Sequence, residues 1–209
     1  MKYLFIDASE NLTHVQTGTE KDFNAKTIDT NRDFAAKITE ICDNMLKEAG
    51  WEKEDLTHLV VCTGPGSLTG LRVADGFLRT LAMVLNIPLI GIDLFKWSVQ
   101  TLSDKGFEGE SRLVMPTLID KAFEVKCSNS SMSTPVLIEK KAIPSNIKTF
   151  GIRYNHEAAE RIDPTPEALH KLILEEANTS KAGIDEILKV LPLYIIPSQA
   201  ERNFKGGDK

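Results

Sequence analysis

Residues 60–72 of the chain read Val-Val-Cys-Thr-Gly-Pro-Gly-Ser-Leu-Thr-Gly-Leu-Arg, and this stretch indicates the fold class. Its first residues belong to an apolar run over 58–63, which is typical of a buried strand, and a glycine-proline turn follows. Ser67 can accept a hydrogen bond from the free N–H groups of a helix that begins with the next residue. A strand, a tight turn and a helix in this order form one unit of an α/β protein.

Helical and strand patterns alternate on both sides of this unit. The helix after Ser67 is expected to reach residue 86, and an earlier helix is expected over 34–49, because apolar residues recur there at spacings of three and four. The other elements expected in the first half are strands over 2–6, 12–16, 24–28 and 87–92 and a helix over 94–102.

A polar, glycine-bearing segment around residues 103–111 marks the expected boundary between two lobes. We expect an N-terminal α/β lobe over 1–103 and a smaller C-terminal α/β lobe over 104–209. The elements expected in the second lobe are strands over 112–119, 123–127, 135–138 and 149–152, a helix over 166–177 and a last apolar run over 190–196. Strands followed by alternating helices and strands, twice over, predict two related lobes.

Composition narrows the classes of function. The 209 residues are 42% apolar and 26% charged, as in a globular protein, and 30 acidic against 25 basic residues give a net charge of −5. This balance argues against nucleic acid as the main partner, because neutralising phosphates requires a basic face. Three scattered cysteines, no apolar run long enough to span a membrane and no secretory leader indicate a cytoplasmic protein with no membrane partner.

The helix after Ser67 has an unusual second face. Its apolar face is broad enough for a sheet to cover, and the opposite face carries Thr69, Arg72, Asp75, Gly76, Arg79, Thr80 and Met83. A glycine in mid-helix costs about 1 kcal/mol relative to alanine. A second helix packing closely would use Gly76 with the small residues, and the charged residues would flank the contact as ion-pairing partners. The alternative is a tolerated glycine on a hydrated surface, and the helix alone leaves both open.

The first helix offers a similar second side, formed by Ala35, Thr39, Cys42 and Leu46. These residues lie at the edge of its wide apolar arc, so both helix edges could meet one partner molecule. The alternative is a wide face that belongs entirely to the core, which is the commoner arrangement.

The ends of two strands suggest an anion site formed by Asp7, Ser9, Gly64, Gly66 and Ser67. Free amides and the positive end of the helix dipole could hold a phosphate at this turn. The alternatives are a tight turn with an ordinary cap and an aspartate that only forms a turn. The turn has neither the lysine of a P-loop nor the spacing of a dinucleotide fingerprint.

Residues that would carry catalysis or bind a metal are not recognisable in this sequence. The four histidines are scattered, and none forms the i, i+4 pair with which a helix holds a metal. Neither a Gly-x-Ser-x-Gly elbow nor a carboxylate pair at a readable spacing is present. We therefore expect no catalytic residues and no metal ligands.

Residues 64–72, followed by 86–92, resemble the TsaB (YeaZ) family, and the opening residues 5–9 are similar to its first strand and Asp-Thr-Ser turn. Residues 192–194 and 200–201 resemble its C-terminal segment. The resemblance implies an actin-like ATPase (ribonuclease H-like) fold of two lobes. It also implies a role in threonylcarbamoylation of the adenosine 3′ of the tRNA anticodon, in which the subunit pairs with the catalytic homologue TsaD and recruits the ATPase TsaE without catalysing the transfer.

The family's pairing surface is formed by its first two helices, here about 32–49 and 67–86, so the resemblance points to the faces that periodicity singled out. It implies no cofactor of this chain's own, with ATP and metal in the partner subunits, and contact with tRNA through the complex only. Without a partner, the exposed helix faces predict a homodimer. The alternative function is a small-molecule kinase or ATPase, with Asp7 holding Mg²⁺ and the turn at Gly64 near phosphate.

Overall fold

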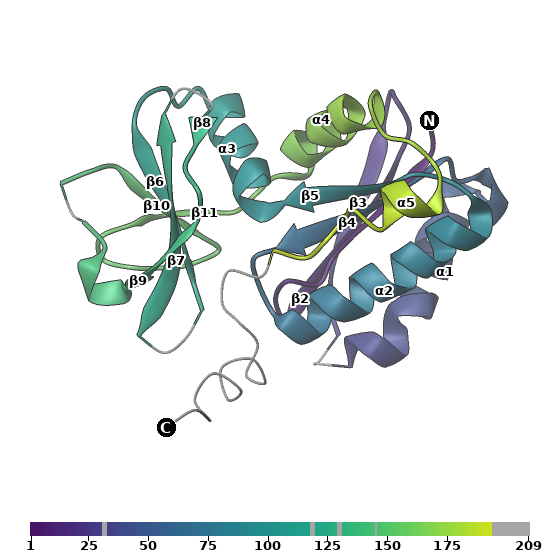
Figure 1. Ribbon diagram of the computed structural model, residues 1–209, viewed down its shortest axis with the longest axis horizontal. Coiled ribbons are helices and arrows are strands. Elements are labelled where there is room, and N and C mark those ends of the chain that lie inside the picture. Colours follow the sequence, from purple (N-terminus) through teal and green to yellow (C-terminus); the bar gives the residue numbers. More distant parts are fainter. Residues whose placement is uncertain (31–32, 118–119, 129–130, 145, 194–209) are drawn as a thin grey trace. The chain divides into compact units, whose positions relative to one another are not determined.

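The computed structural model describes residues 1–30, 33–117, 120–128, 131–144 and 146–193. It separates into two compact units (Figure 1). Unit 1 contains Met1–Lys105 and Pro164–Pro192, and unit 2 contains Gly106–Asp163 together with Leu193. The last part of the apolar run expected over 190–196 and the C-terminal resemblance at 200–201 lie outside the described residues.

Unit 1 is built on a five-stranded sheet of order β3-β2-β1-β4-β5. Its strands are β1 (Tyr3–Asp7), β2 (Leu12–Gly18), β3 (Phe23–Asp29), β4 (His58–Gly64) and β5 (Leu89–Asp93). The first three form an antiparallel meander, and β4 and β5 join β1 in parallel. The α/β class predicted from the sequence is confirmed.

Helices cover both faces of this sheet. Successive side chains of the central strand β1 point to opposite faces, and every one of its residues is buried. Leu4 and Ile6 belong to one core with α1 (Phe34–Ala49) and α2 (Leu68–Leu85). On the other face, Phe5 packs edge-to-face on Trp97 of α3 (Leu94–Asp104), and the Tyr3 hydroxyl lies 2.8 Å from His170 of α4 (Pro166–Ala177).

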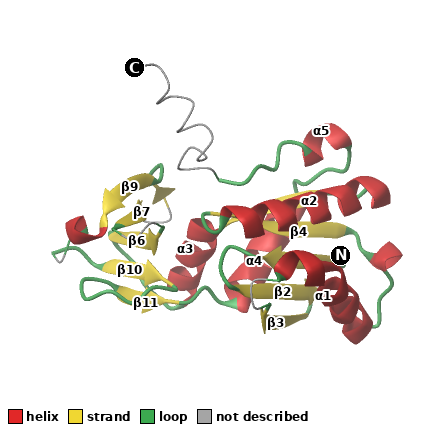
Figure 2. Ribbon diagram, turned by 90° about the horizontal axis from the view of Figure 1, so that it is seen from below, coloured by secondary structure: helices red, strands yellow, loops and turns green. Residues whose placement is uncertain are grey.

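Unit 2 repeats the strand arrangement of unit 1 (Figure 2). Strands β6 (Ser111–Pro116) and β7 (Lys121–Ser128) are antiparallel, whereas β10 (Thr149–Ile152) and β11 (Glu160–Ile162) extend the sheet from β6 in parallel. Two short strands, β8 (Ser131–Met132) and β9 (Val136–Glu139), pair with β7. The prediction of two related lobes is confirmed at the level of strand order, although the described part of 106–163 contains no α-helix, only a 3₁₀ turn (Lys140–Ala142).

The C-terminal helices group with unit 1, which differs from the boundary expected from the sequence. Residues 164–192 were expected in the second lobe, but α4 packs on α3. The Trp97 indole donates a hydrogen bond of 2.7 Å to the carbonyl of Thr165, and the Thr101 hydroxyl accepts one from the Thr165 N–H. These contacts join residues more than 60 positions apart, so sequence pattern could not reveal them.

Most elements of unit 1 lie close to their predicted positions, and the expected helix over 166–177 coincides with α4. Five short elements in the described ranges were not expected. They are the strands β8 and β11, the 3₁₀ turns Lys53–Asp55 and Lys140–Ala142, and the helix α5 (Ile184–Ile187). Elements of two to four residues are too short to show a period. No helix in the described ranges combines the length and apolar character needed to cross a bilayer.

Candidate partner-binding surface

Helices α1 and α2 lie on the same face of the unit 1 sheet and pack against each other. Their buried sides share one core with β1 and β4, to which Ile38, Met45, Ala74 and Leu78 contribute. The packing of both helices on the sheet therefore fixes the position of their predicted second faces. The residues predicted to form the surface separate into three groups, which are exposed, covered by another segment, or buried in the core.

The exposed group on α2 is a stripe of four residues, Thr69, Arg72, Gly76 and Thr80. An added Cβ at Gly76 would have no heavy atom within 4 Å, so the helix surface there is open. The Thr80 hydroxyl donates to the Gly76 carbonyl at 2.8 Å and so satisfies its own hydrogen-bonding need within the helix. Met83, which was also predicted, is half-buried because it packs against the core from the edge of this stripe.

Asp75 and Arg79 were predicted to flank a contact with another molecule, but they are engaged within this chain. Their side chains are 15% and 14% exposed and form a two-pronged ion pair, with Arg79 Nη2 at 2.8 Å and Nε at 3.2 Å from the carboxylate. Arg79 also donates from Nη1 to the Ile187 carbonyl at 2.8 Å and from Nη2 to the Val190 carbonyl. In the isolated chain, therefore, these two side chains pair with each other and with these backbone carbonyls, and their place at a partner contact stays a prediction.

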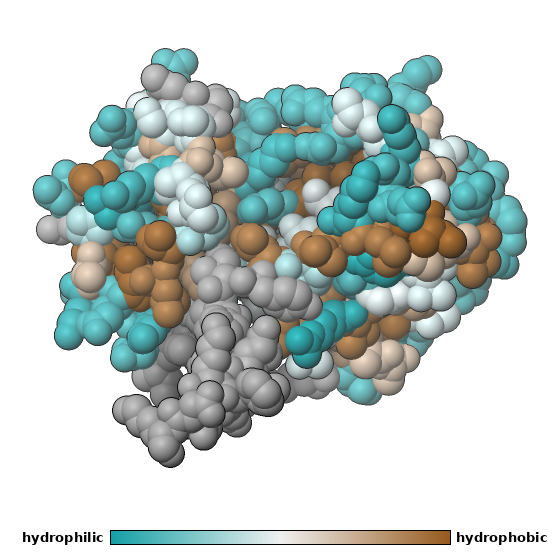
Figure 3. Space-filling model, viewed as in Figure 1, coloured by the Kyte–Doolittle hydropathy of each residue, from teal (hydrophilic) through white to brown (hydrophobic). Residues whose placement is uncertain are grey.

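The segment that covers Asp75 and Arg79 consists of residues 184–190, which we call the α5 segment. Ile187 is buried in the shared core, and the space where Gly91 of β5 lacks a side chain is filled by Val190, whose Cγ1 would lie 2.9 Å from an added Cβ. The exposed side of this segment is apolar, with Ile184, Leu188 and the following Leu191 between 50% and 65% exposed. In Figure 3 apolar side chains gather along it.

The four residues predicted on α1 divide evenly. Ala35 and Thr39 are exposed, whereas Cys42 and Leu46 are 3% and 6% exposed and belong to the core shared with the sheet. Burial also raises the pKa of the Cys42 thiol to about 12, as for a thiol surrounded by apolar groups. The prediction that Cys42 and Leu46 lie on the surface is wrong, since the wide apolar arc of α1 is a wide core face at these positions.

The predicted anion site is a closely packed crossing of two turns. The turn before α2 contacts the end of β1, where the Ser67 N–H donates to the Ser9 carbonyl at 2.7 Å. A Cβ at Gly66 would lie 2.4 Å from the Ser9 side chain, and a Cβ at Gly70 would lie 2.0 Å from the Ala8 carbonyl oxygen. These two glycines therefore let the two backbones approach each other.

The remaining members of this set have structural partners too. Asp7 is completely buried, and its carboxylate accepts the Ser9 N–H at 2.8 Å, as in an Asx turn. Gly64 has φ +95°, which glycine adopts at little cost, and Ser67 caps α2 by accepting the Gly70 N–H at 3.4 Å. The structure brings all five residues together, and the contacts it shows are those of a turn and a cap.

This geometry predicts that the isolated chain does not bind nucleotide. Titration of ATP and Mg²⁺ into the chain is expected to give no heat of binding up to millimolar concentration. The reason is that Ser9 and Ala8, which follow β1, fill the space beside Gly66 and Gly70 that a phosphate would need. Isothermal titration calorimetry measures this directly. A sub-millimolar affinity that disappears in Asp7→Asn would contradict the expectation and support the kinase or ATPase alternative.

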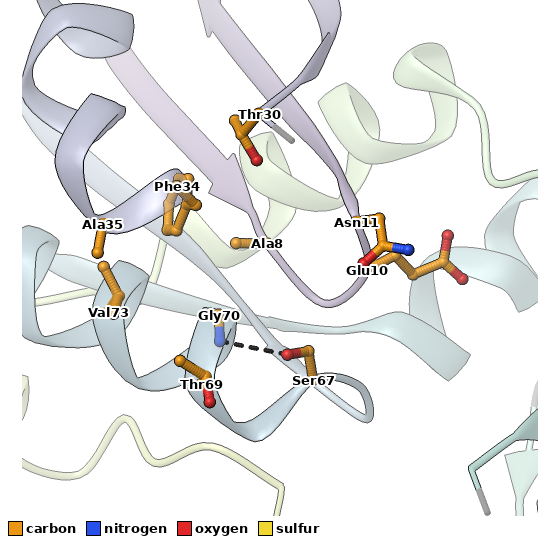
Figure 4. Close-up of a pocket in the computed structure, with 10 residues that line it drawn as sticks. All are labelled: Ala8, Glu10, Asn11, Thr30, Phe34, Ala35, Ser67, Thr69, Gly70 and Val73. Carbon is orange, nitrogen blue, oxygen red and sulfur yellow. Dashed lines mark hydrogen bonds between the residues drawn. The ribbon is translucent and has the colours of Figure 1, made fainter. Parts of the chain in front are cut away.

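A cavity of about 260 Å³ lies between the N-terminal ends of α1 and α2 and the end of β1 (Figure 4). Ala35 and Thr69 line it, and both also belong to the predicted surface. In Figure 4 Ala35 and Val73 point toward each other at one end, and Glu10 and Asn11 lie at the other. The remaining lining residues are Ala8, Thr30, Phe34, Ser67 and Gly70.

The sequence did not single out this cavity or Val84, which is 73% exposed near the C-terminal end of α2. Val84 could have been found, because at about 100° per residue it lies only about 20° around the helix from Val73, eleven positions earlier. The cavity could not, because it is formed by three segments that meet only in the folded chain. Within the described ranges no three His, Cys, Asp or Glu side chains form a cluster that could hold a metal ion.

Both the sequence and the structure of this chain are similar to those of known proteins. The family model described as TsaD, tRNA N6-adenosine threonylcarbamoyltransferase, matches residues 28–110. The TsaB protein of Bacillus subtilis is 35% identical over 68 residues, which are 32% of this chain and 28% of that protein. The TsaB protein of Escherichia coli is 28% identical over 92 residues, 44% of this chain and 40% of that protein. Both curated relatives are named tRNA threonylcarbamoyladenosine biosynthesis proteins, and the chain matches less than half of their length.

The structural likeness extends over nearly the whole chain. YeaZ from Pseudomonas aeruginosa superposes with a TM-score of 0.72 at 17% identity, covering 92% of this chain and 99% of that one. A second structure from that organism, described as an uncharacterized protein with similarity to peptidase YEAZ, gives a TM-score of 0.75 at 17% identity over 93% and 99% of the two chains. At this identity the likeness shows a common fold.

Proposed function

We propose, from the confirmed resemblance of this chain to the TsaB (YeaZ) family, that it is a subunit of the machinery that makes threonylcarbamoyladenosine in tRNA. In this proposal it does not catalyse the transfer. It pairs with a TsaD-like catalytic subunit through the exposed faces of α1 and α2, and the pair recruits a TsaE-like ATPase. ATP and metal belong to those partners, tRNA is bound by the complex, and the setting is the cytoplasm.

The observation that carries the proposal is the open surface at Gly76. A glycine at an exposed helix position costs about 1 kcal/mol relative to alanine, and no neighbouring atom of this chain uses the space it leaves. Gly66 and Gly70 contrast with it, because at each of them the neighbouring backbone fills that space. Close approach of a partner helix is a physical reason for Gly76, since interaxial distances of about 8 Å require small residues at the contact.

The comparisons support the choice of partner. The match to the TsaD family model over residues 28–110 includes both α1 and α2. A chain and its homologue can present equivalent faces to each other, as two copies do in an isologous dimer. The α5 segment makes the proposed surface on α2 smaller, because it covers Asp75 and Arg79 and leaves Thr69, Arg72, Gly76 and Thr80 exposed. On α1 the exposed residues of the proposed surface are Ala35 and Thr39.

The test is the binding of the purified TsaD-like subunit from the same organism to Gly76→Phe. The bulky ring would hold the two helices apart, and we expect affinity to fall by at least about 100-fold while the monomer stays folded. Calorimetry or gel filtration of the mixed subunits measures pairing, and circular dichroism measures folding.

Asn44→Phe is the matched control. Asn44 is exposed on α1 and precedes by one turn Glu48, which pairs with Lys26 of β3, so this edge of α1 faces away from α2. Normal pairing of Asn44→Phe and loss of pairing by Gly76→Phe support the proposed surface. Undiminished pairing by Gly76→Phe would refute it.

A further inference from the structure

The cavity at the N-terminal ends of α1 and α2 contains a buried hydroxyl group that has no partner in the described part of the chain. Thr30 follows β3 and is 2% exposed. Its backbone carbonyl accepts hydrogen bonds from the Asp33 N–H at 2.9 Å and from Lys37 Nζ at 3.3 Å. Its hydroxyl makes none with the described residues, and in Figure 4 it points into the cavity. A buried polar group without a partner costs free energy, so this hydroxyl indicates a ligand that would complete its hydrogen bonding.

The same cavity lies at the positive ends of two helix dipoles. Phe34 and Ala35, which line it, are the first two residues of α1. Thr69 and Gly70, which also line it, are the second and third residues of α2. The residue before α1 provides no side-chain cap, and the residue before α2 caps only Gly70, so the N–H groups of Ala35 and Thr69 have no acceptor among the described residues. Free amides at helix N-termini bind anions, and two such ends at one cavity favour a negatively charged ligand.

The other walls of the cavity limit the size and the kind of anion. Phe34 and Val73 contribute apolar surface, and Ala35 adds its methyl group at the same end. Glu10 lies at the opposite end, where its negative charge would repel an anion and so favours a position near Thr30. The volume of about 260 Å³ is below the range of about 300–1,000 Å³ that is typical of drug-sized ligands. A ligand that fits therefore has one anionic group and one short apolar group.

We propose that this cavity binds a small organic acid, a carboxylate that carries a short branched apolar chain. The carboxylate accepts hydrogen bonds from the Thr30 hydroxyl and from first-turn N–H groups of α1 and α2, and the apolar chain lies against Phe34 and Val73. The volume excludes a nucleotide, so the site agrees with the expected absence of ATP binding. Binding needs this chain alone and does not depend on a partner subunit.

The experiment titrates three probes into the full chain and follows the amide signals by NMR. Isovalerate has the carboxylate and the branched chain, isobutylamine replaces the carboxylate with an ammonium group, and phosphate is an anion without a chain. We expect isovalerate to bind with a Kd of about 1 mM or tighter and to shift the amide signals of Ala35 and Thr69. The other two probes should bind at least about 10-fold more weakly. No binding of isovalerate well above this Kd, or equal binding of another probe, would overturn the inference.

Thr30→Val tests the hydroxyl, because it keeps the shape of the side chain. Isovalerate binding should weaken at least about 10-fold, since a hydrogen bond to a charged group is lost. The urea midpoint of the free variant should not fall, because the hydroxyl has no partner in the described chain to lose. Undiminished binding would overturn the inference, and so would a lower midpoint, which would show that the hydroxyl already has a partner within the chain.

Thr101→Val is the matched control, on α3 at the other face of the sheet. Its hydroxyl is also completely buried, but it accepts the Thr165 N–H at 3.1 Å and donates to the Trp97 carbonyl at 3.0 Å. This variant should therefore lose stability and keep the wild-type affinity for isovalerate. Equal losses of affinity in Thr101→Val and Thr30→Val would contradict a site at Thr30.

Ala35→Leu tests the apolar end of the cavity without touching a buried residue. Ala35 is exposed, so the variant should fold, and the larger side chain should fill the space that the apolar chain of isovalerate needs. We expect the affinity for isovalerate to fall at least about 5-fold. Unchanged affinity would place isovalerate elsewhere and overturn the inference. The proposed function fails separately, through pairing of Gly76→Phe with the TsaD-like subunit.

Discussion

Gly70→Ala is expected to destabilise the folded chain by about 3 kcal/mol, whereas Gly76→Ala, on the same helix, is expected to stabilise it by about 1 kcal/mol. At Gly70 the new methyl would lie 2.0 Å from the Ala8 carbonyl oxygen, a backbone atom that can move only if the end of β1 moves with it. At Gly76 the methyl meets nothing within 4 Å, and only the gain in helix propensity remains.

Urea denaturation of the two variants and the wild type measures this difference as a shift of the midpoint at constant slope. Because both substitutions add the same methyl to the same helix, differences in helix propensity largely cancel between them. Equal stabilities of the two variants would contradict the close approach of α2 to β1. It would also weaken the view that the turn glycines serve packing rather than phosphate binding.

Arg79→Met is expected to destabilise the chain by about 2 kcal/mol and to release the α5 segment from α2. The substitution keeps the apolar stem but leaves the Asp75 carboxylate without its guanidinium partner and frees two backbone carbonyls, those of Ile187 and Val190. The estimate is below the cost of breaking a fully buried pair, because both side chains keep some contact with water.

Hydrogen exchange of the amides over 184–190 tests the release, and urea denaturation tests the stability. Arg72→Met is the control, since Arg72 lies on the same helix and is exposed, so its loss should change stability by no more than about 0.5 kcal/mol. Wild-type exchange rates in Arg79→Met would show that Ile187 and Val190 hold the segment without the guanidinium. In that case the α5 segment would have to be treated as part of the core.

The sequence did not predict the partners that Asp75 and Arg79 have within the chain, for a reason that applies to helix faces in general. Periodicity shows which side of a helix is polar, but a polar side can be covered by a segment that is distant in the chain. Here that segment begins more than 100 residues later and has only four helical residues, too few to show a pattern. Cys42 and Leu46 were predicted on the surface but are buried in the core. The sheet beneath α1 determines how much of the helix the core covers, and the periodicity of α1 does not show this.

The α/β class, the strand-turn-helix unit around residues 58–86 and the small-residue stripe on α2 could all be predicted from the amino-acid sequence. These follow from local periodicity and from turn and capping residues, which act over a few positions. Three other features become visible in the folded chain alone. Gly66 and Gly70 serve packing while Gly76 faces open space, the α5 segment engages Arg79, and a cavity separates the ends of α1 and α2. Each of these depends on atoms brought together by folding, and the spacing of residues along the chain carries no record of such distances.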